Sequence, residues 1–322
     1  MARKRIGQMS WLDGAIEQRA SRRRDRLGEI AGLIDWRPFE KLLSGIHSAA
    51  RGEASYPPLM MFKVLLVQRW YDLSDPAMEE ALYDRLSFRR FAGLALEDDT
   101  PDHSTIFRFR DALTRGGLMA PLLAELMRQL DGKGAILKQG TLIDATLIQS
   151  AARRPRMDED KVSPVDPDAR FGANNERRRF VFGYKLHVAV DAGSALVRAL
   201  VVTPANVQEI SCARALVQGD ELAVYGDRSY DAGSFHRDLA EAGIADGILR
   251  RNRPTHRLGP DEVARNHALS LRRRAVEKLF GTLKRSYGFT RVPYFNLARN
   301  ATALALACFA FNLRRWQAIV TA

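Results

Sequence analysis

The spacing of apolar residues changes once along this chain, near residue 135, and that change limits the folds it can adopt. Before it, apolar residues recur as in short amphipathic helices, with helix-starting signals at Pro57-Pro58, Ser74-Asp75-Pro76 and Asp102. After it, Thr141 to Ile148 form a near-continuous apolar run rich in β-branched residues, which is typical of a buried strand. We therefore expect an all-helical domain at residues 1–135 and an α/β domain at residues 136–322.

The pattern of the second domain predicts an order of strands and helices. A polar stretch with three prolines, residues 151–179, is expected to form a long loop after the first strand. The segments that follow are expected to be strands at 180–191 and 195–203 joined by a hairpin, a helix at 207–218, a strand at 222–225, a helix at 234–242, a strand at 247–250 and a helix at 265–287. Three strands followed by alternating helices and strands is the order of the RNase H-like fold.

Composition narrows the class of protein. The 322 residues include 50 Lys and Arg against 38 Asp and Glu, a net charge of +12, which favours an anionic partner. Hydrophobic residues make up 46% of the chain, enough for a sizeable core. The basic N-terminus lacks the apolar stretch of a secretory signal, and the most apolar run, residues 301–313, is shorter than a membrane span of about 20 residues. With two cysteines, Cys212 and Cys308, these features predict a cytoplasmic protein with no membrane partner.

Three acidic residues are candidates for chemistry. Asp144 lies within the apolar run of the first strand, where an ionised carboxylate is costly unless it is paired or binds a metal. Asp227 follows a short strand, at the edge where ligands gather in open α/β sheets. Glu277 lies beside the apolar stripe of a helix. Each has a structural alternative, respectively an Asp that reaches solvent at a strand end, a helix-capping Asp, and an ion pair between Glu277 and Arg273.

Taken together, these carboxylates predict a metal site on a basic surface. In an RNase H-like sheet the three residues can meet, and oxygen ligands suit hard divalent cations such as Mg²⁺. Two such ions about 3.5–4 Å apart stabilise an in-line phosphoryl displacement. Residues 250–291 contain twelve Lys and Arg against three acids, a net charge of +9. This stretch contains a cluster of three arginines, Arg250, Arg251 and Arg253, and we expect phosphates to offset their mutual repulsion. The alternative is that the basic stretch is a solvated helix face.

Several segments resemble the bacterial insertion-sequence DDE transposases, and most closely the IS-five family of the IS-four/IS-five superfamily. The clearest is the signature of Arg, three residues, Glu, six residues and Lys, represented here by Arg273, Glu277 and Lys284. Ser270 stands where this signature often has Tyr. The other similar segments are 56–63, 141–148, 183–187, 202–207 and 225–230.

The resemblance implies that Asp144, Asp227 and Glu277 bind two Mg²⁺ ions, for which Mn²⁺ can substitute, and catalyse cleavage of the element's ends. The freed 3′-hydroxyl would then attack target DNA. Lys284 would contact the DNA end, with Arg273 as a supporting contact, and Arg274 and Arg285 are further candidate DNA contacts. The resemblance also implies terminal inverted repeats as a DNA partner, and a homodimer or larger assembly on DNA in the bacterial nucleoid.

Other interpretations remain open at this stage. An RNase H-like endonuclease without strand transfer would need the same three acids. A domesticated, non-catalytic DNA-binding regulator would be expected to have lost one of them, whereas all three are present here. In the first domain, Arg3-Lys4-Arg5 and Arg22-Arg23-Arg24 are expected either to contact phosphates or to form a solvated terminus. His103 and His187 are expected to be structural.

Overall fold

The computed structural model describes residues 3–8, 10, 11, 13, 14, 25–46, 55–156, 162–174, 179–254 and 257–321. The chain forms two compact units, one of Met1–Gln129 with Ala305–Ala322, the other of Leu130–Leu304. The expected domains, 1–135 and 136–322, differ from these units mainly in one respect. Residues 305–322, expected in the second domain, belong to the first unit.

The first unit is helical over its described residues, as expected. Its helices begin where the sequence predicted caps: the Ser74 side chain accepts a hydrogen bond from the backbone of Ala77, and that of Asp102 from Thr105. The helices are α2 (Arg26–Gly32), α3 (Arg37–Leu43), α4 (Pro58–Trp70), α5 (Asp75–Asp84), α6 (Leu86–Ala92), α7 (His103–Arg115), most of α8 (Met119–Gly132) and the later part of α13 (Leu297–Val320).

Aromatic packing and one buried polar network hold the first unit together. The ring of Phe309 packs edge-on against Phe39 and Phe62, with centroid distances of 5.7 and 5.2 Å. The buried guanidinium of Arg110 donates to Gln68 and to Asp75, so its charge is compensated inside the bundle. Among the described helices, none has the length and hydropathy of a membrane span.

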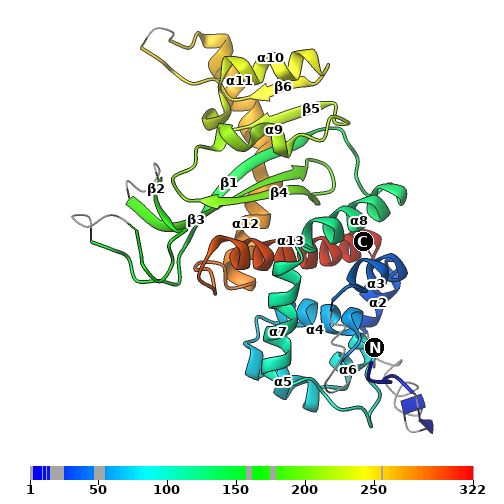
Figure 1. Ribbon diagram of the computed structural model, residues 1–322. Helices are drawn as coiled ribbons and strands as arrows, with labels where there is room; N and C mark the ends of the chain where they lie inside the picture. Colours follow the sequence, from blue (N-terminus) through cyan, green and yellow to red (C-terminus); the bar gives the residue numbers. More distant parts are fainter. Residues whose placement is uncertain are drawn as a thin grey trace. The chain divides into compact units, whose positions relative to one another are not determined.

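The second unit is built on a six-stranded mixed sheet (Figure 1). Its strands are β1 (Thr141–Gln149), β2 (Arg170–Asn174), β3 (Arg179–Asp191), β4 (Val197–Pro204), β5 (Ala223–Gly226) and β6 (Ala245–Ile248). Their order is β2-β3-β1-β5-β6, with β4 also paired to β3. The pairs β1–β3 and β3–β4 are antiparallel, whereas β1–β5 and β5–β6 are parallel. This is the topology of the RNase H-like fold, which confirms the predicted fold class.

Three local predictions differ from the structure. The expected loop at 151–179 contains β2, and its residues 157–161 and 175–178 lie outside the described chain. The expected helix at 207–218 is a 3₁₀ turn, η1 (Glu209–Cys212), followed by the single turn α9 (Ala213–Leu216). The last expected helix, 265–287, is two helices, α11 (Pro260–Ser270) and α12 (Arg274–Ser286), joined by the 3₁₀ turn η3 (Leu271–Arg273).

Helices cover both faces of this sheet. Apolar residues of α9 and of α10 (Gly233–Glu241) pack with Ile143 of β1 and Val224 of β5 in one buried cluster. On the other side of the sheet, α12 runs along β1 and buries its stripe of Val276, Leu279 and Leu283, as the helical spacing predicted (Figure 1). The site described below therefore forms on inner strands of a sheet that helices cover on both faces.

Gly183 is a position where the sheet leaves no room for a side chain. A Cβ there would lie 2.2 Å from the carbonyl oxygen of Ile148 and 2.6 Å from the backbone nitrogen of Ser150. Because backbone atoms cannot move aside, Gly183→Ala should lower the free energy of unfolding by about 1–3 kcal/mol or more in a urea titration. The control is Gly233→Ala, whose Cβ meets nothing within 4 Å and which should be neutral or slightly stabilising. Equal stability of the two variants would contradict this reading.

Candidate active site

The register of two parallel strands places two of the predicted acids side by side. In the β1–β5 pair, Ile143 lies opposite Gly226, the last residue of β5. Asp144 is the next residue of β1 and Asp227 directly follows β5, so the two residues lie side by side at the carboxyl end of β5. Gly226 fits closely there, since a Cβ would approach side-chain atoms of Ile143, Ile248 and Tyr230 at 2.9–3.1 Å and these would have to shift. Two of the three expected acids are thus neighbours.

Glu209 supplies a third carboxylate that the sequence interpretation missed. Asp144, Glu209 and Asp227 each offer an oxygen, and these oxygens lie within 4.8 Å of one another. Glu209 begins the turn η1, which follows β4 and packs on η2 (Arg228–Tyr230), the turn that begins after Asp227. A signal was present in the sequence, because Glu209 comes two residues after the family-like segment 202–207.

Two cations contact this cluster. The Arg273 guanidinium donates from Nη2 to Asp144 Oδ2 at 2.5 Å, and Lys185 Nζ lies 3.5 Å from Glu209 Oε1. Burial nevertheless raises the pKa of Asp144, against the charge of Arg273, and the nearby charge of Asp227 adds to the rise. Burial also raises the pKa of Glu209, as does Asp227, against the charge of Lys185. For both carboxyls, burial and the neighbouring acids therefore outweigh the cations, which favour the charged form.

Asp227 also has the structural role that was considered as an alternative. Its side chain caps η2, with Oδ1 accepting from the backbone of Ser229 at 2.7 Å. The capping bond occupies one face of the carboxylate and fixes its direction. The two roles are compatible, because a carboxylate has about four acceptor positions.

Glu277 lies in the first turn of α12, is exposed, and is not a member of the three-carboxylate cluster. The pKa of Arg273 is raised. Burial lowers it, but the charge of Asp144 raises it more than that of Glu277 does, and Glu277 still contributes to the rise. Within the described residues, Arg273 pairs with Asp144, and no ion pair joins it to Glu277 within 4 Å. The alternative of an ordinary Arg273–Glu277 pair is therefore wrong, and metal binding by Glu277 stays a prediction.

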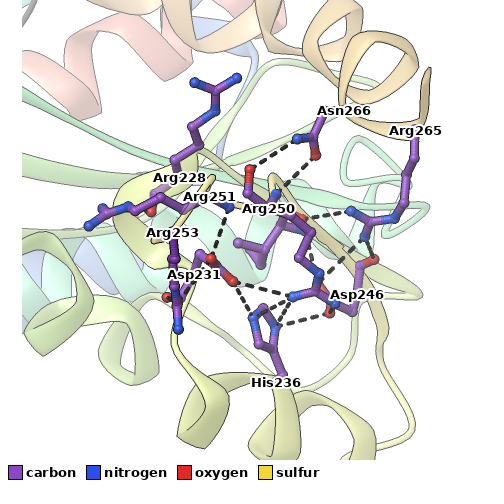
Figure 2. A network of polar contacts seen from close by, with 10 residues as sticks. Arg228, Asp231, His236, Asp246, Arg250, Arg251, Arg253, Arg265 and Asn266 are labelled. Atoms are coloured by element: carbon purple, nitrogen blue, oxygen red, sulfur yellow. Dashed lines mark hydrogen bonds and ion pairs between the residues drawn. The ribbon is translucent and has the colours of Figure 1, made fainter. Parts of the chain in front are cut away.

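Acidic residues of the same unit compensate part of the charge of the cluster Arg250, Arg251 and Arg253, contrary to expectation. Figure 2 shows Arg250 beside Asp246, to which it donates at 2.6 Å, while Arg253 donates to Asp231 at 3.0 Å. The third arginine, Arg251, donates through its side chain to a backbone carbonyl, that of Arg228. The pKa of Asp231 is lowered despite its burial, by hydrogen bonds from His236 and the Arg251 backbone and by the charge of Arg253. Contact of these arginines with DNA stays a prediction.

The other predicted DNA contacts lie mainly along α12. Lys284 lies two turns after Glu277 and is half-buried, and Arg285 is exposed. The backbone of Arg274 begins α12. In the first unit, Arg3 donates to the Ser44 carbonyl and Lys4 lies 3.8 Å from Asp99, whereas Arg22-Arg23-Arg24 lies outside the described residues.

The donor set fits a hard divalent cation. Metal–oxygen bonds of Mg²⁺ and Ca²⁺ are about 2.0–2.6 Å long. Three carboxylate oxygens within 4.8 Å of one another are close enough for small side-chain movements to bring them onto one ion placed between them. No sulfur or imidazole belongs to this cluster of described residues, so the site suits an oxygen-loving ion better than a thiolate-preferring one.

Comparison with known proteins agrees with this geometry. Residues 15–112 match the family described as Transposase domain (DUF772), and residues 136–313 match the family described as Transposase DDE domain. Among solved structures, the chain is similar to a piggyBac transposase synaptic complex with hairpin DNA, with a TM-score of 0.47 and 10% identity over 93% of this chain and 76% of that one. It is also similar to a pre-cleavage Mos1 transpososome, with a TM-score of 0.20 and 12% identity over 82% of this chain and 97% of that one.

The family matches, and not these distant structural likenesses, decide the assignment. The match to the DDE domain spans more than half of the chain and includes the whole RNase H-like sheet. It also includes Asp144, Glu209, Asp227 and Glu277. With two acids brought together by strand register at the carboxyl end of β5, this chain belongs to the DDE transposases.

Proposed function

We propose that this transposase cleaves DNA at the ends of an insertion element and joins the freed 3′-hydroxyl to target DNA, using Mg²⁺ or, as a substitute, Mn²⁺. The observation that carries the proposal is the β1–β5 register, which places Asp144 next to Asp227 in a chain of the DDE family. Terminal inverted repeats as the recognised DNA, a homodimer or larger assembly on it, a place in the nucleoid and membership of the IS-five family all remain predictions from the resemblance.

In this mechanism the residues of the chain hold the reactants. Asp144 and Asp227 would hold the cations, with Glu277 as the third acid implied by the family. The ions, when bound, would supply activation of the attacking oxygen and stabilisation of the leaving one. Arg273 orients Asp144 through its hydrogen bond to Oδ2, and the backbone N–H of Ala145 donates to Oδ1 at 2.8 Å. Each oxygen keeps a further acceptor position for a ligand. Lys284 and Arg285 would hold the phosphate backbone on α12.

A product assay tests the proposal. The purified full-length chain is incubated with Mg²⁺, DNA that carries both ends of the element, and a circular target plasmid. Target DNA joined to the ends supports a transposase that carries out both steps. Nicks without joining would instead show an endonuclease, and binding without cleavage would show a regulator, and either result would overturn strand transfer.

The predicted phosphate contact of Lys284 has its own test. Lys284→Ala should weaken binding to any duplex and lower the slope of log affinity against log salt by about one, because one fewer counterion is released. Lys278→Ala is the matched control, since this exposed lysine lies on a different face of the same helix. Fluorescence anisotropy at several salt concentrations measures both slopes. A slope unchanged in Lys284→Ala would contradict the contact.

A further inference from the structure

We propose that Glu209 is a ligand of the catalytic metal, a fourth acidic position beyond the Asp144, Asp227 and Glu277 that the DDE signature implies. The inference rests on the proposed function, since it assigns one more residue to the same site. It also names the turn η1 as part of the active site, although this turn carries no residue of the signature.

Position is the first argument. Glu209 begins η1 after β4, and this turn packs on η2, which is capped by Asp227. That packing turns the Glu209 carboxylate inward, where one of its oxygens lies within 4.8 Å of oxygens from Asp144 and Asp227. A carboxylate with a purely structural role would be expected to point away from two others, because like charges repel strongly where water is scarce.

The charge balance is the second argument. Lys185 Nζ donates to the Val207 carbonyl at 2.9 Å and lies farther, 3.5 Å, from Glu209 Oε1. The shorter contact of Lys185 is therefore with the backbone of the segment that carries Glu209, and its contact with the Glu209 carboxylate is the longer one. Among the described residues, Lys185 and Arg273 are the cations that pair with the three acids, so the cluster keeps a net negative charge. A divalent cation offsets that charge.

A buried hydroxyl gives an independent third argument. Tyr230 is fully buried, and its hydroxyl has no hydrogen-bond partner among the described residues. Its pKa is raised well above the ordinary value, by burial and then by the charges of Glu209, Asp144 and Asp227. A buried polar group without a partner is costly and calls for an explanation. Water or a ligand held by the three carboxylates would give this hydroxyl its partner.

Binding of Mn²⁺ alone to the full-length chain tests the proposal. Loss of an outer-sphere partner typically costs 10–100-fold in metal affinity, so Glu209→Gln, which removes a direct ligand, should weaken Mn²⁺ binding at least about tenfold. Titration followed by electron paramagnetic resonance gives the affinity without any activity measurement. Glu241→Gln is the matched control, because it changes an exposed glutamate of α10 in the same unit and should bind as the wild type does.

The outcomes separate this inference from the proposed function. If Asp144→Asn weakens Mn²⁺ binding and Glu209→Gln does not, Glu209 is no ligand and the proposed function stands. If neither change weakens binding, the metal site itself is wrong. Glu209→Asp keeps the carboxylate and should bind Mn²⁺ more tightly than Glu209→Gln does. If Lys185→Met also weakens Mn²⁺ binding, Glu209 is still the ligand and Lys185 positions it.

A second measurement does not depend on the folding of any variant. Fe²⁺ bound in place of Mn²⁺ generates radicals with peroxide and ascorbate, and these cut the wild-type backbone near the ion. Cuts near residues 144, 209 and 227 together support the proposal. Cuts near 144 and 227 without any near 209 would overturn it.

Discussion

Replacement of Asp144 by Asn should lower the rate of Mg²⁺-dependent cleavage of end-containing DNA by a factor on the order of a thousand or more. Asp144 is the acid that β1 places in the cluster at a buried position, 7% exposed, next to the end of β5. Asn has nearly the same shape but no charge, so it keeps the packing and loses the ligand. Single-turnover cleavage of labelled end DNA, with enzyme in excess, measures the rate of the chemical step.

DNA binding distinguishes loss of chemistry from loss of structure in this variant. The predicted phosphate contacts lie on α12 and in the Arg250–Arg253 loop, so Asp144→Asn should bind end DNA about as well as the wild type. Asp261→Asn is the matched control, because Asp261 is an exposed acid in the first turn of α11, and this change should leave cleavage unaltered. Wild-type cleavage by Asp144→Asn would remove Asp144 from the active site.

Much of the second unit could be predicted because its strands carry their own signal. The apolar runs of β1 and β3 are largely buried, and the turn signal at 191–194 predicts the hairpin that joins β3 to the mostly half-buried β4. β2 could not be predicted in the same way. Its sequence, Arg170 to Asn174, is short, polar at both ends and contains a glycine, and it becomes a strand by pairing with β3.

The site shows the same division between local and tertiary information. Asp144 could be found because a carboxylate interrupts the apolar run of β1, and Asp227 because it directly follows a short strand. For Glu209 the only signal was its closeness to the family-like segment 202–207, because its place in the cluster depends on how η1 packs on η2. Likewise, a count of charges along residues 250–253 does not include Asp231 and Asp246, which reach the same loop through the fold.

A buried histidine beside the site should make the protein sensitive to acid. His187 lies in the middle of the sheet, opposite Ala145 of β1 and Val201 of β4, and is fully buried. Its Nε2 lies 2.9 Å from the Thr203 hydroxyl, while Nδ1 has no hydrogen-bond partner among the described residues. Burial, with the charge of Lys185, lowers the pKa of His187 from its ordinary 6.5 to about 4.

The direction of the effect follows from this lowered pKa. Below about pH 6.5 the unfolded chain takes up a proton on His187 while the folded chain does not, so protonation favours unfolding. The contribution to stability is complete above pH 6.5 and is lost as the pH falls toward 4, by about 3 kcal/mol in total. His187 pairs across the sheet with Ala145, the residue after Asp144, so its protonation acts next to the site.

His187→Gln should remove this part of the acid sensitivity. The variant loses ring packing and is expected to be less stable than the wild type at pH 8, but Gln does not titrate. The difference in unfolding free energy between the two should therefore shrink by up to about 3 kcal/mol between pH 7 and pH 4. Urea titrations followed by circular dichroism at several pH values measure it, and His267→Gln, at an exposed position of α11, should follow the wild type throughout. A difference between wild type and His187→Gln that stays constant with pH would show that His187 titrates alike in the folded and unfolded chain.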